Sequence, residues 1–103
     1  MYQLVLTTCP NEVVAKDIAQ HLVTEKLAGC VNIIPNITSV YCWKNELQCD
    51  SEVQLLIKTT SEIFDALNAR INELHPYEVV EVIALNIQQG DKHYLNWITE
   101  SLK

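Results

Sequence analysis

The 103-residue sequence predicts an α+β fold in which an antiparallel sheet carries helices on one face. Short β-branched runs alternate with segments of helical periodicity along the chain. At 49% hydrophobic residues, the chain can form a single core with apolar surface to spare. The longest β-branched stretch, residues 28–60, is typical of two strands joined by a tight turn. We therefore expect one domain spanning residues 1–103 that is organised around a long hairpin.

The first elements are a strand and a helix. The run YQLVLTT predicts a strand over Tyr2–Thr8, because it is short, apolar and β-branched and Pro10 stops it. Asn11 is expected to cap a helix from Glu12 to about Lys26, with a carboxylate in the first turn where the helix dipole favours it. The predicted inward stripe of this helix is Val14, Ala15, Ile18, Ala19, Leu22 and Val23.

The hairpin is predicted over residues 28–60 with its turn at Lys44-Asn45-Glu46. Each arm of about 14 residues would reach roughly 45 Å, whereas a helix of about 15 residues covers only roughly 22 Å. The far end should therefore extend past the rest of the subunit and meet another subunit. The apolar side chains expected to lie uncovered there are Val40, Tyr41, Trp43, Leu47 and Val53.

Two further features lie within the hairpin. Pro35 cannot donate to a strand ladder, so the first arm is expected to bend or bulge at Pro35-Asn36. A two-residue Asn45-Glu46 loop would place Cys42 directly opposite Cys49, in reach of a disulfide or a shared soft metal. A three-residue loop would break that pairing, and free thiols are the ordinary state of cysteines in a protein without an export signal.

The second half repeats the strand and helix alternation. Thr60 or Ser61 is expected to cap a helix that Pro76 ends, because the residue before proline is disfavoured in helical dihedrals. A fourth strand is predicted over Val80–Gln88, and Asp91 should cap a final short helix. Its predicted inward residues are Tyr94, Leu95, Ile98 and Leu102. The order βαββαβ plus a helix is the split-βαβ, ferredoxin-like pattern.

Charge and motif content narrow the function classes. Thirteen acidic against seven basic residues give a net charge of −6, which argues against nucleic acid and is compatible with metal cations. The sequence shows neither a signal-peptide pattern nor an apolar run of about 18 residues, so we expect a cytoplasmic protein without a membrane partner. It contains no GxSxG, Walker, GxGxxG or HExxH motif, which predicts a binding protein rather than an enzyme.

Five local motifs, in order along the chain, resemble those of one known family. They are Leu27-Ala28-Gly29-Cys30-Val31-Asn32-Ile33 with Pro35, Ser39-x-Tyr41-x-Trp43, Glu52 with Lys58-Thr59, Leu74-His75-Pro76-Tyr77 with Glu81, and Tyr94-Leu95-x-Trp97. Together, from end to end, they resemble the CutA divalent-cation tolerance proteins. The resemblance implies a ferredoxin-like subunit, a homotrimer assembled through the long hairpins, and a link to tolerance of copper and other divalent metals.

The resemblance also implies where a metal would bind. The copper ligands proposed for the family are a cysteine in the first strand and two histidines before the proline, and the aligned positions here are Thr7, Leu74 and His75. Only His75 keeps a metal-capable side chain, so the predicted donors for copper(II) or another divalent cation are His75, Cys9 and Cys30. A carboxylate or a neighbouring subunit would have to complete the shell. The alternative is a structural histidine hydrogen-bonded to a carbonyl.

A cleft between subunits is the expected place for a ligand, because this topology puts the second and fourth strands at the sheet edges. The residues predicted to line it are Glu52, Lys58, Tyr77 and Glu81. The alternative for these four is a set of interfacial ion pairs and hydrogen bonds. Three functions stay open: weak cation binding at the clefts, small-molecule signalling in a trimer similar to the PII proteins, and a stable scaffold whose part in metal tolerance is indirect.

Overall fold

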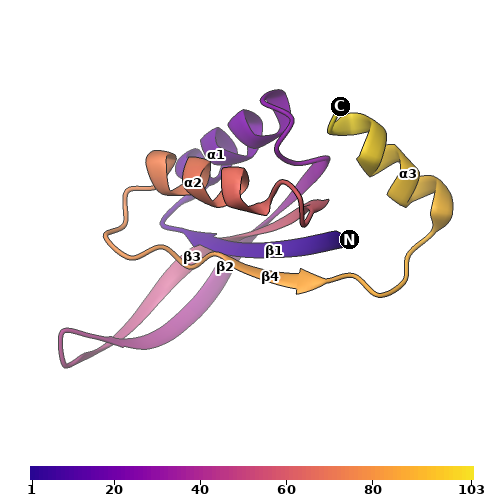
Figure 1. The fold of residues 1–103 in the computed structure, drawn as a ribbon. Helices are drawn as coiled ribbons and strands as arrows, with labels where there is room; N and C mark the ends of the chain where they lie inside the picture. The colour runs from indigo at the N-terminus through magenta and orange to yellow at the C-terminus, as the bar shows by residue number, and fades with distance from the viewer.

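The computed structural model describes residues 1–103 as a four-stranded antiparallel sheet with α1 and α2 side by side on one face (Figure 1). The strand order is β2-β3-β1-β4, so β2 and β4 are the edge strands. The α+β, ferredoxin-like prediction is confirmed. The elements are β1 Tyr2–Cys9, α1 Glu12–Thr24, β2 Cys30–Trp43, β3 Glu46–Thr60, α2 Phe64–Leu74, β4 Ile83–Asn86 and α3 Lys92–Ser101.

The core lies between the two central strands and the helix layer. Alternate residues of β1 and β3 face the helices, as the period of two along a strand requires. The fully buried core side chains are Val5, Cys9, Leu55 and Ile57 from the sheet and Ala15, Ile18, Leu22, Leu67 and Ile71 from the helices. Each buried leucine or isoleucine contributes about 1.5–3 kcal/mol of hydrophobic stabilisation. The core is therefore confined to the width that α1 and α2 cover.

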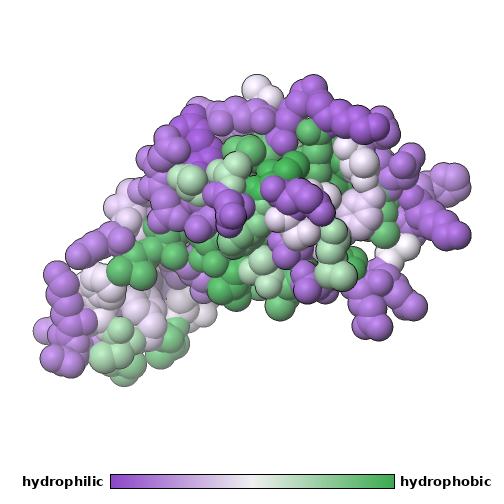
Figure 2. All heavy atoms as spheres, in the orientation of Figure 1, coloured by the Kyte–Doolittle hydropathy of each residue, from purple (hydrophilic) through white to green (hydrophobic).

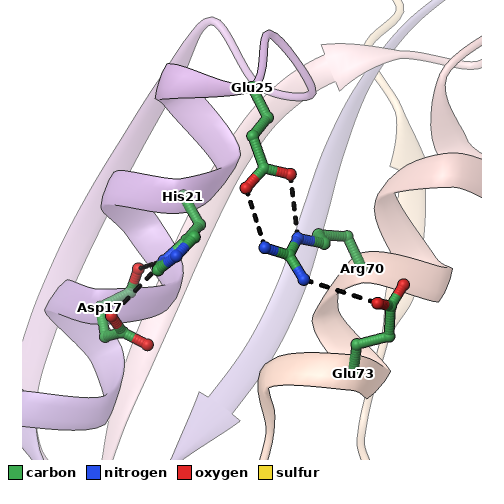
Figure 3. A network of polar contacts seen from close by, with 5 residues as sticks. All are labelled: Asp17, His21, Glu25, Arg70 and Glu73. Carbon is green, nitrogen blue, oxygen red and sulfur yellow. Dashed lines mark hydrogen bonds and ion pairs between the residues drawn. The ribbon is translucent and has the colours of Figure 1, made fainter.

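An ion-pair network joins the two helices on their outer side (Figure 3). Arg70 of α2 donates from Nε and Nη2 to the two carboxylate oxygens of Glu25, at 2.9 and 3.0 Å. Its Nη1 also lies 3.5 Å from Glu73, and His21 pairs with Asp17 one turn earlier in α1. The hydrogen bonds from Arg70 lower the pKa of Glu25 below its usual value. The network holds the C-terminal end of α1 against α2.

The helix caps follow the sequence in two of three cases. Asn11 Oδ1 accepts from the Val14 N–H at 2.9 Å, and Asp91 Oδ2 accepts from the Tyr94 N–H at 3.0 Å, so both predicted N-caps are confirmed.

The start of α2 differs from the prediction. Its N-cap is Ile63, which makes no side-chain cap, while Thr60 still belongs to β3. Ser61 is not the cap either, because its Oγ bonds to the Met1 amino group and to Glu62 rather than to a backbone N–H of the helix. The end of α2 is as predicted: His75, before Pro76, leaves the helix with φ −84° and ψ 137°.

The hairpin turns on Lys44-Asn45, both in the left-handed region with φ 51° and 67°. Trp43 pairs with Glu46 on either side of this two-residue turn. The sequence left two loops open, a two-residue Asn45-Glu46 loop and a three-residue loop. The observed two-residue turn lies one position earlier, so the pairing of Cys42 with Cys49 does not form. Cys42 lies opposite Leu47, Cys49 lies opposite Val40, and all four cysteines are free thiols.

The predicted irregularity at Pro35 is present. Ile34 pairs with Gln54 and Ile37 pairs with Glu52, so three steps along β2 match two along β3. Asn36 takes up the difference with φ 61°. The β2 arm thus bulges where β1 ends on the other side of β3, at the Cys9–Val53 pair.

Beyond the bulge the hairpin projects away from the rest of the chain (Figure 1). With the hairpin included, the molecule is 45 Å along its longest axis. Hydrophobic residues, green in Figure 2, reach the surface of this projecting part. Four of the five predicted side chains are exposed there: Val40 by 64%, Tyr41 by 42%, Trp43 by 38% and Leu47 by 78%. Val53 is not, because it packs into the core opposite Cys9 and is only 5% exposed.

The fourth strand is shorter than predicted. Only Ile83–Asn86 pair with β1, whereas the prediction ran from Val80 to Gln88. Val80 and Val82 pack against the core instead of continuing the ladder, which explains the late start of the strand.

The last helix packs across the sheet end through its buried Ile98. A Cβ at Gly29 would lie 3.1 Å from Ile98 Cγ2, so the glycine permits this close approach. Tyr94, predicted to face inward, is 41% exposed and stacks on Trp97 with ring centroids 5.8 Å apart. That prediction is wrong because Ile98 is the one residue of α3 that is buried, so the turn that carries Tyr94 stays exposed.

We expect Lys44→Asn to raise the free energy of unfolding by about 0.5 kcal/mol, because asparagine tolerates the left-handed region better than lysine. Urea unfolding should show a higher midpoint. Lys44→Ala is the control: it removes the ammonium group 5.7 Å from the Trp43 ring without relieving the backbone, and should bring no gain. A lower or unchanged midpoint for Lys44→Asn would contradict the strain at this turn.

Candidate functional site

Polar side chains converge at the base of the hairpin, where β1 ends and the loop after α2 passes. Pro76 directs the chain out of the helix here, which brings His75 and Tyr77 to the end of the sheet. They meet Glu52, which pairs with Ile37 just beyond the bulge, and Cys9, the last residue of β1. Four of the predicted site residues therefore lie in one place.

His75 is buried, with 7% of its surface exposed, and both of its ring nitrogens are engaged. Nε2 lies 2.7 Å from the Thr8 carbonyl oxygen, and Nδ1 lies 3.2 Å from the backbone nitrogen of Tyr77. Because a carbonyl only accepts and an amide N–H only donates, the network assigns a neutral ring with its proton on Nε2. No lone pair of the ring is left over for a cation.

Tyr77 links this histidine to the hairpin. Its hydroxyl donates to Glu52 Oε2 at 2.7 Å, and its ring centroid lies 4.5 Å from that of His75. Glu52 is itself only 7% exposed. Burial, and then the bond to Glu52, raise the pKa of Tyr77 far above its usual value, so the hydroxyl stays a donor at neutral pH.

Cys9 is fully buried beside these residues. Burial, and then the charge of Glu52, raise the pKa of the Cys9 thiol from 9.0 to about 11. The sulfur is therefore protonated at neutral pH. Because the thiolate is the form that binds metals, a cation would have to displace the thiol proton to bind Cys9.

The structure does not bring the other predicted residues to this place. Lys58 lies six residues from Glu52 along β3, about 20 Å at the rise of a strand, and its ammonium group donates to Asn32. Cys30 pairs with Lys58 at that distant end of the hairpin. Glu81 is exposed in the loop before β4. Within one chain the predicted cleft set is thus divided: Tyr77 is hydrogen-bonded to Glu52, while neither Lys58 nor Glu81 is bonded to either of them.

A copper centre of the kind that the resemblance implies does not fit the residues of one chain. No group of three histidine, cysteine, aspartate or glutamate side chains is placed to hold a metal ion. Copper(II) needs several donors, while His75 is engaged at both nitrogens and Cys9 is a fully buried thiol. The alternative expected for His75, a histidine hydrogen-bonded to a carbonyl, is present. The sequence did not identify that carbonyl as the one of Thr8, because no sequence signal marks a backbone group as a partner.

Comparison with known proteins identifies the family. Residues 3–101 match the family described as CutA1 divalent ion tolerance protein. The chain belongs to the CutA1 family. The Protein CutA homolog of Xenopus laevis is 57% identical over 91 residues, which cover 88% of this chain. The divalent-cation tolerance protein CutA of Thermus thermophilus is 48% identical over 101 residues, 98% of either chain.

Solved CutA1 structures share the whole fold. The divalent cation tolerance protein from Thermus thermophilus superposes with a TM-score of 0.97 and covers 100% of both chains. The protein from Archaeoglobus fulgidus, described as periplasmic, reaches 0.97 at 33% identity. The chain spans only 52–60% of the length of the Xenopus, mouse and human CutA proteins. No helix of the chain is long and apolar enough to cross a membrane.

We expect the free energy of unfolding to fall between pH 9 and 11 because of Cys9. Over this range the unfolded chain releases the thiol proton while the folded chain keeps it, so stability is lost as pH rises. In Cys9→Ala the fall should be shallower in urea titrations at each pH, whatever its stability at pH 8. Cys49→Ala, at an exposed thiol, is the control and should keep the wild-type slope. Equal slopes in all three chains would refute this assignment.

Proposed function

We propose that this CutA1-family protein acts in divalent-cation tolerance as a homotrimer joined through its long hairpins, and that it binds cations weakly, copper(II) among them, at clefts between subunits. The observation that carries the proposal is the exposed apolar end of the hairpin. Its four large side chains, Val40, Tyr41, Trp43 and Leu47, are 38–78% exposed in one chain. Burying apolar surface gains about 25 cal/mol per Å², which favours a partner on this segment.

The far edge of the sheet supports association as well. β4 is an edge strand whose Ile83 and Leu85 are 50% and 52% exposed. Edge strands that present apolar side chains and free backbone groups pair with other chains unless they are protected. A hairpin that extends from one subunit can cover such an edge on the next. A ring of like subunits would then bury both surfaces in every copy.

Cation binding between subunits is proposed because one chain does not supply a complete set of ligands. The net charge of −6 attracts cations, yet one chain groups no three ligand side chains. A complete shell therefore needs donors from more than one chain, and such a shared site forms only in the assembly. Of the residues predicted for it, Glu81 is the carboxylate that is exposed and open to a neighbour. His75 would first have to give up a hydrogen bond to the chain.

We further propose a binding role rather than an enzymatic one, since the titratable groups at the hairpin base are already engaged. Tyr77 is hydrogen-bonded to Glu52, His75 is bonded to two backbone groups, and the Cys9 thiol is protonated. The cytoplasm remains the location that we propose from the sequence. Relatives named chloroplastic in rice and periplasmic in A. fulgidus belong to other compartments.

We expect Leu47→Glu to convert the trimer into monomers, because it places a charge in the proposed contact. Sedimentation velocity at micromolar concentration should show about one third of the wild-type mass. Val13→Glu is the matched control: Val13 on α1 is 79% exposed and Leu47 is 78% exposed, but only Leu47 lies on the hairpin. A wild-type chain that sediments as a monomer, or equal masses for both variants, would refute the assembly.

Copper binding should depend on assembly. Calorimetric titration with copper(II) is expected to give weak binding to the wild-type protein and to Val13→Glu, and none to Leu47→Glu, since the donors of two chains no longer meet. An unchanged binding heat in the monomeric variant would show that one chain is sufficient to bind copper(II). It would refute binding at clefts between subunits.

A further inference from the structure

We propose that His75, Tyr77 and Glu52 form a clasp that sets the direction in which the hairpin leaves the subunit, so that His75 is a positioning residue. The inference deepens the proposed function and rests on it in one respect: the direction of the hairpin decides where a neighbouring subunit must lie. The clasp is defined by three hydrogen bonds, from His75 to Thr8, from the Tyr77 amide to His75, and from the Tyr77 hydroxyl to Glu52.

The hairpin needs such a support because the hydrogen-bond ladders on the two sides of β3 are interrupted at the same level. On one side β1 stops at Cys9 opposite Val53, so the part of β3 toward the turn has no strand beside it there. On the other side the β2 ladder is interrupted between Ile34 and Ile37. A bulge bends a strand and weakens its pairing locally. Residues 37–52 therefore form a two-stranded ribbon that adjoins the sheet at its weakest level.

The clasp is placed at this level. Glu52 pairs with Ile37, the first ladder pair beyond the bulge. The bond between the Tyr77 hydroxyl and Glu52 is the only side-chain hydrogen bond that joins residues 37–52 to the rest of the chain. From Tyr77 the connection continues through the His75 ring to the carbonyl of Thr8 in β1. The ribbon base, the loop after α2 and the end of β1 are thus held together.

Burial gives these bonds their effect. His75 and Glu52 are each 7% exposed, so a partner lost from either leaves a buried polar group unsatisfied. A hydroxyl bound to a carboxylate is also among the stronger hydrogen bonds. Pro76, between the two rings, restricts the backbone that carries them. Both ring nitrogens of His75 take part in this arrangement, one as a donor and one as an acceptor. This gives the buried histidine a structural role that needs no metal ion.

The test compares two tyrosines that each bond a carboxylate. Tyr77→Phe removes the bond to Glu52 and keeps the ring. Tyr41→Phe removes the bond from Tyr41 to Asp50, at 2.5 Å, which lies wholly within the ribbon. Residual dipolar couplings of nitrogen-15-labelled protein report the orientation of residues 37–52 relative to β1 and β3. They are measured in the wild-type and Leu47→Glu backgrounds. In the monomeric Leu47→Glu background no neighbouring subunit can hold the ribbon in place.

We expect one alignment to fit ribbon and sheet together in the parent chain and in the control, Tyr41→Phe. In Tyr77→Phe the ribbon couplings should shrink or need a different orientation, and the wild-type background should show more monomer on dilution. Glu52→Gln, which keeps an acceptor oxygen, should preserve the orientation, and Glu52→Ala should lose it. His75→Ala should behave as Tyr77→Phe does.

Unchanged ribbon couplings in Tyr77→Phe would overturn the clasp, and so would a variant that loses thermal stability while the ribbon keeps its orientation. A wild-type chain that proves monomeric would refute the proposed assembly instead. The clasp is then still tested, because the orientation is measured within one chain.

Discussion

The structure depends on a mismatch of strand lengths. β1 has 8 residues, while β2 and β3 have 14 and 15. Since β1 supplies one neighbour of β3 and lies beneath the helices, the core and the helix layer reach only as far as β1 does. Beyond the Cys9–Val53 pair the hairpin is a ribbon that leaves both faces in solvent, except at its base, where Glu52 is buried. The exposed apolar end and the bonds at the ribbon base are consequences of that limit.

The body of the subunit is stabilised separately from the ribbon. Its core is drawn from β1, β3, α1 and α2, and the Arg70–Glu25 pair holds the helices to each other on their outer side. None of these contacts involves the ribbon. One chain therefore contains a self-sufficient body and a projecting part whose apolar surface the body leaves uncovered. Membership of the CutA1 family and the likeness to its solved structures cover the two parts together.

The sequence predicted the features that short-range chemistry controls. Asn11 and Asp91 cap helices because a cap needs only the next three residues, and Pro35 predicts its bulge because proline lacks a donor. The turn lies within the predicted Lys44-Asn45-Glu46, but its length was left open, because lysine seldom adopts the left-handed conformation that Lys44 has here. The register that would pair Cys42 with Cys49 is not formed. Val53 and Tyr94 were misplaced because their burial depends on where β1 ends and how α3 crosses the sheet.

Short-range motifs predicted only part of the site. Motifs pointed to His75, Tyr77 and Glu52, which the fold brings together, but they also pointed to Lys58 and Cys30, which lie at the other end of the hairpin. Sequence spacing could not separate these groups, because distance along one long strand is visible only once its pairing is known. The partner of His75 is a backbone carbonyl 67 positions away, and every residue has one.

The uncovered ribbon also has a consequence during biosynthesis. The segment TSVYCW, residues 38–43, has no charge and no proline, and it is the kind of strand that stacks with copies of itself when chains are crowded on a polysome. The surplus of six negative charges acts against such encounters by keeping newly made chains apart until they fold. The acidic composition thus offsets the tendency to aggregate that an exposed pair of strands brings to a single chain.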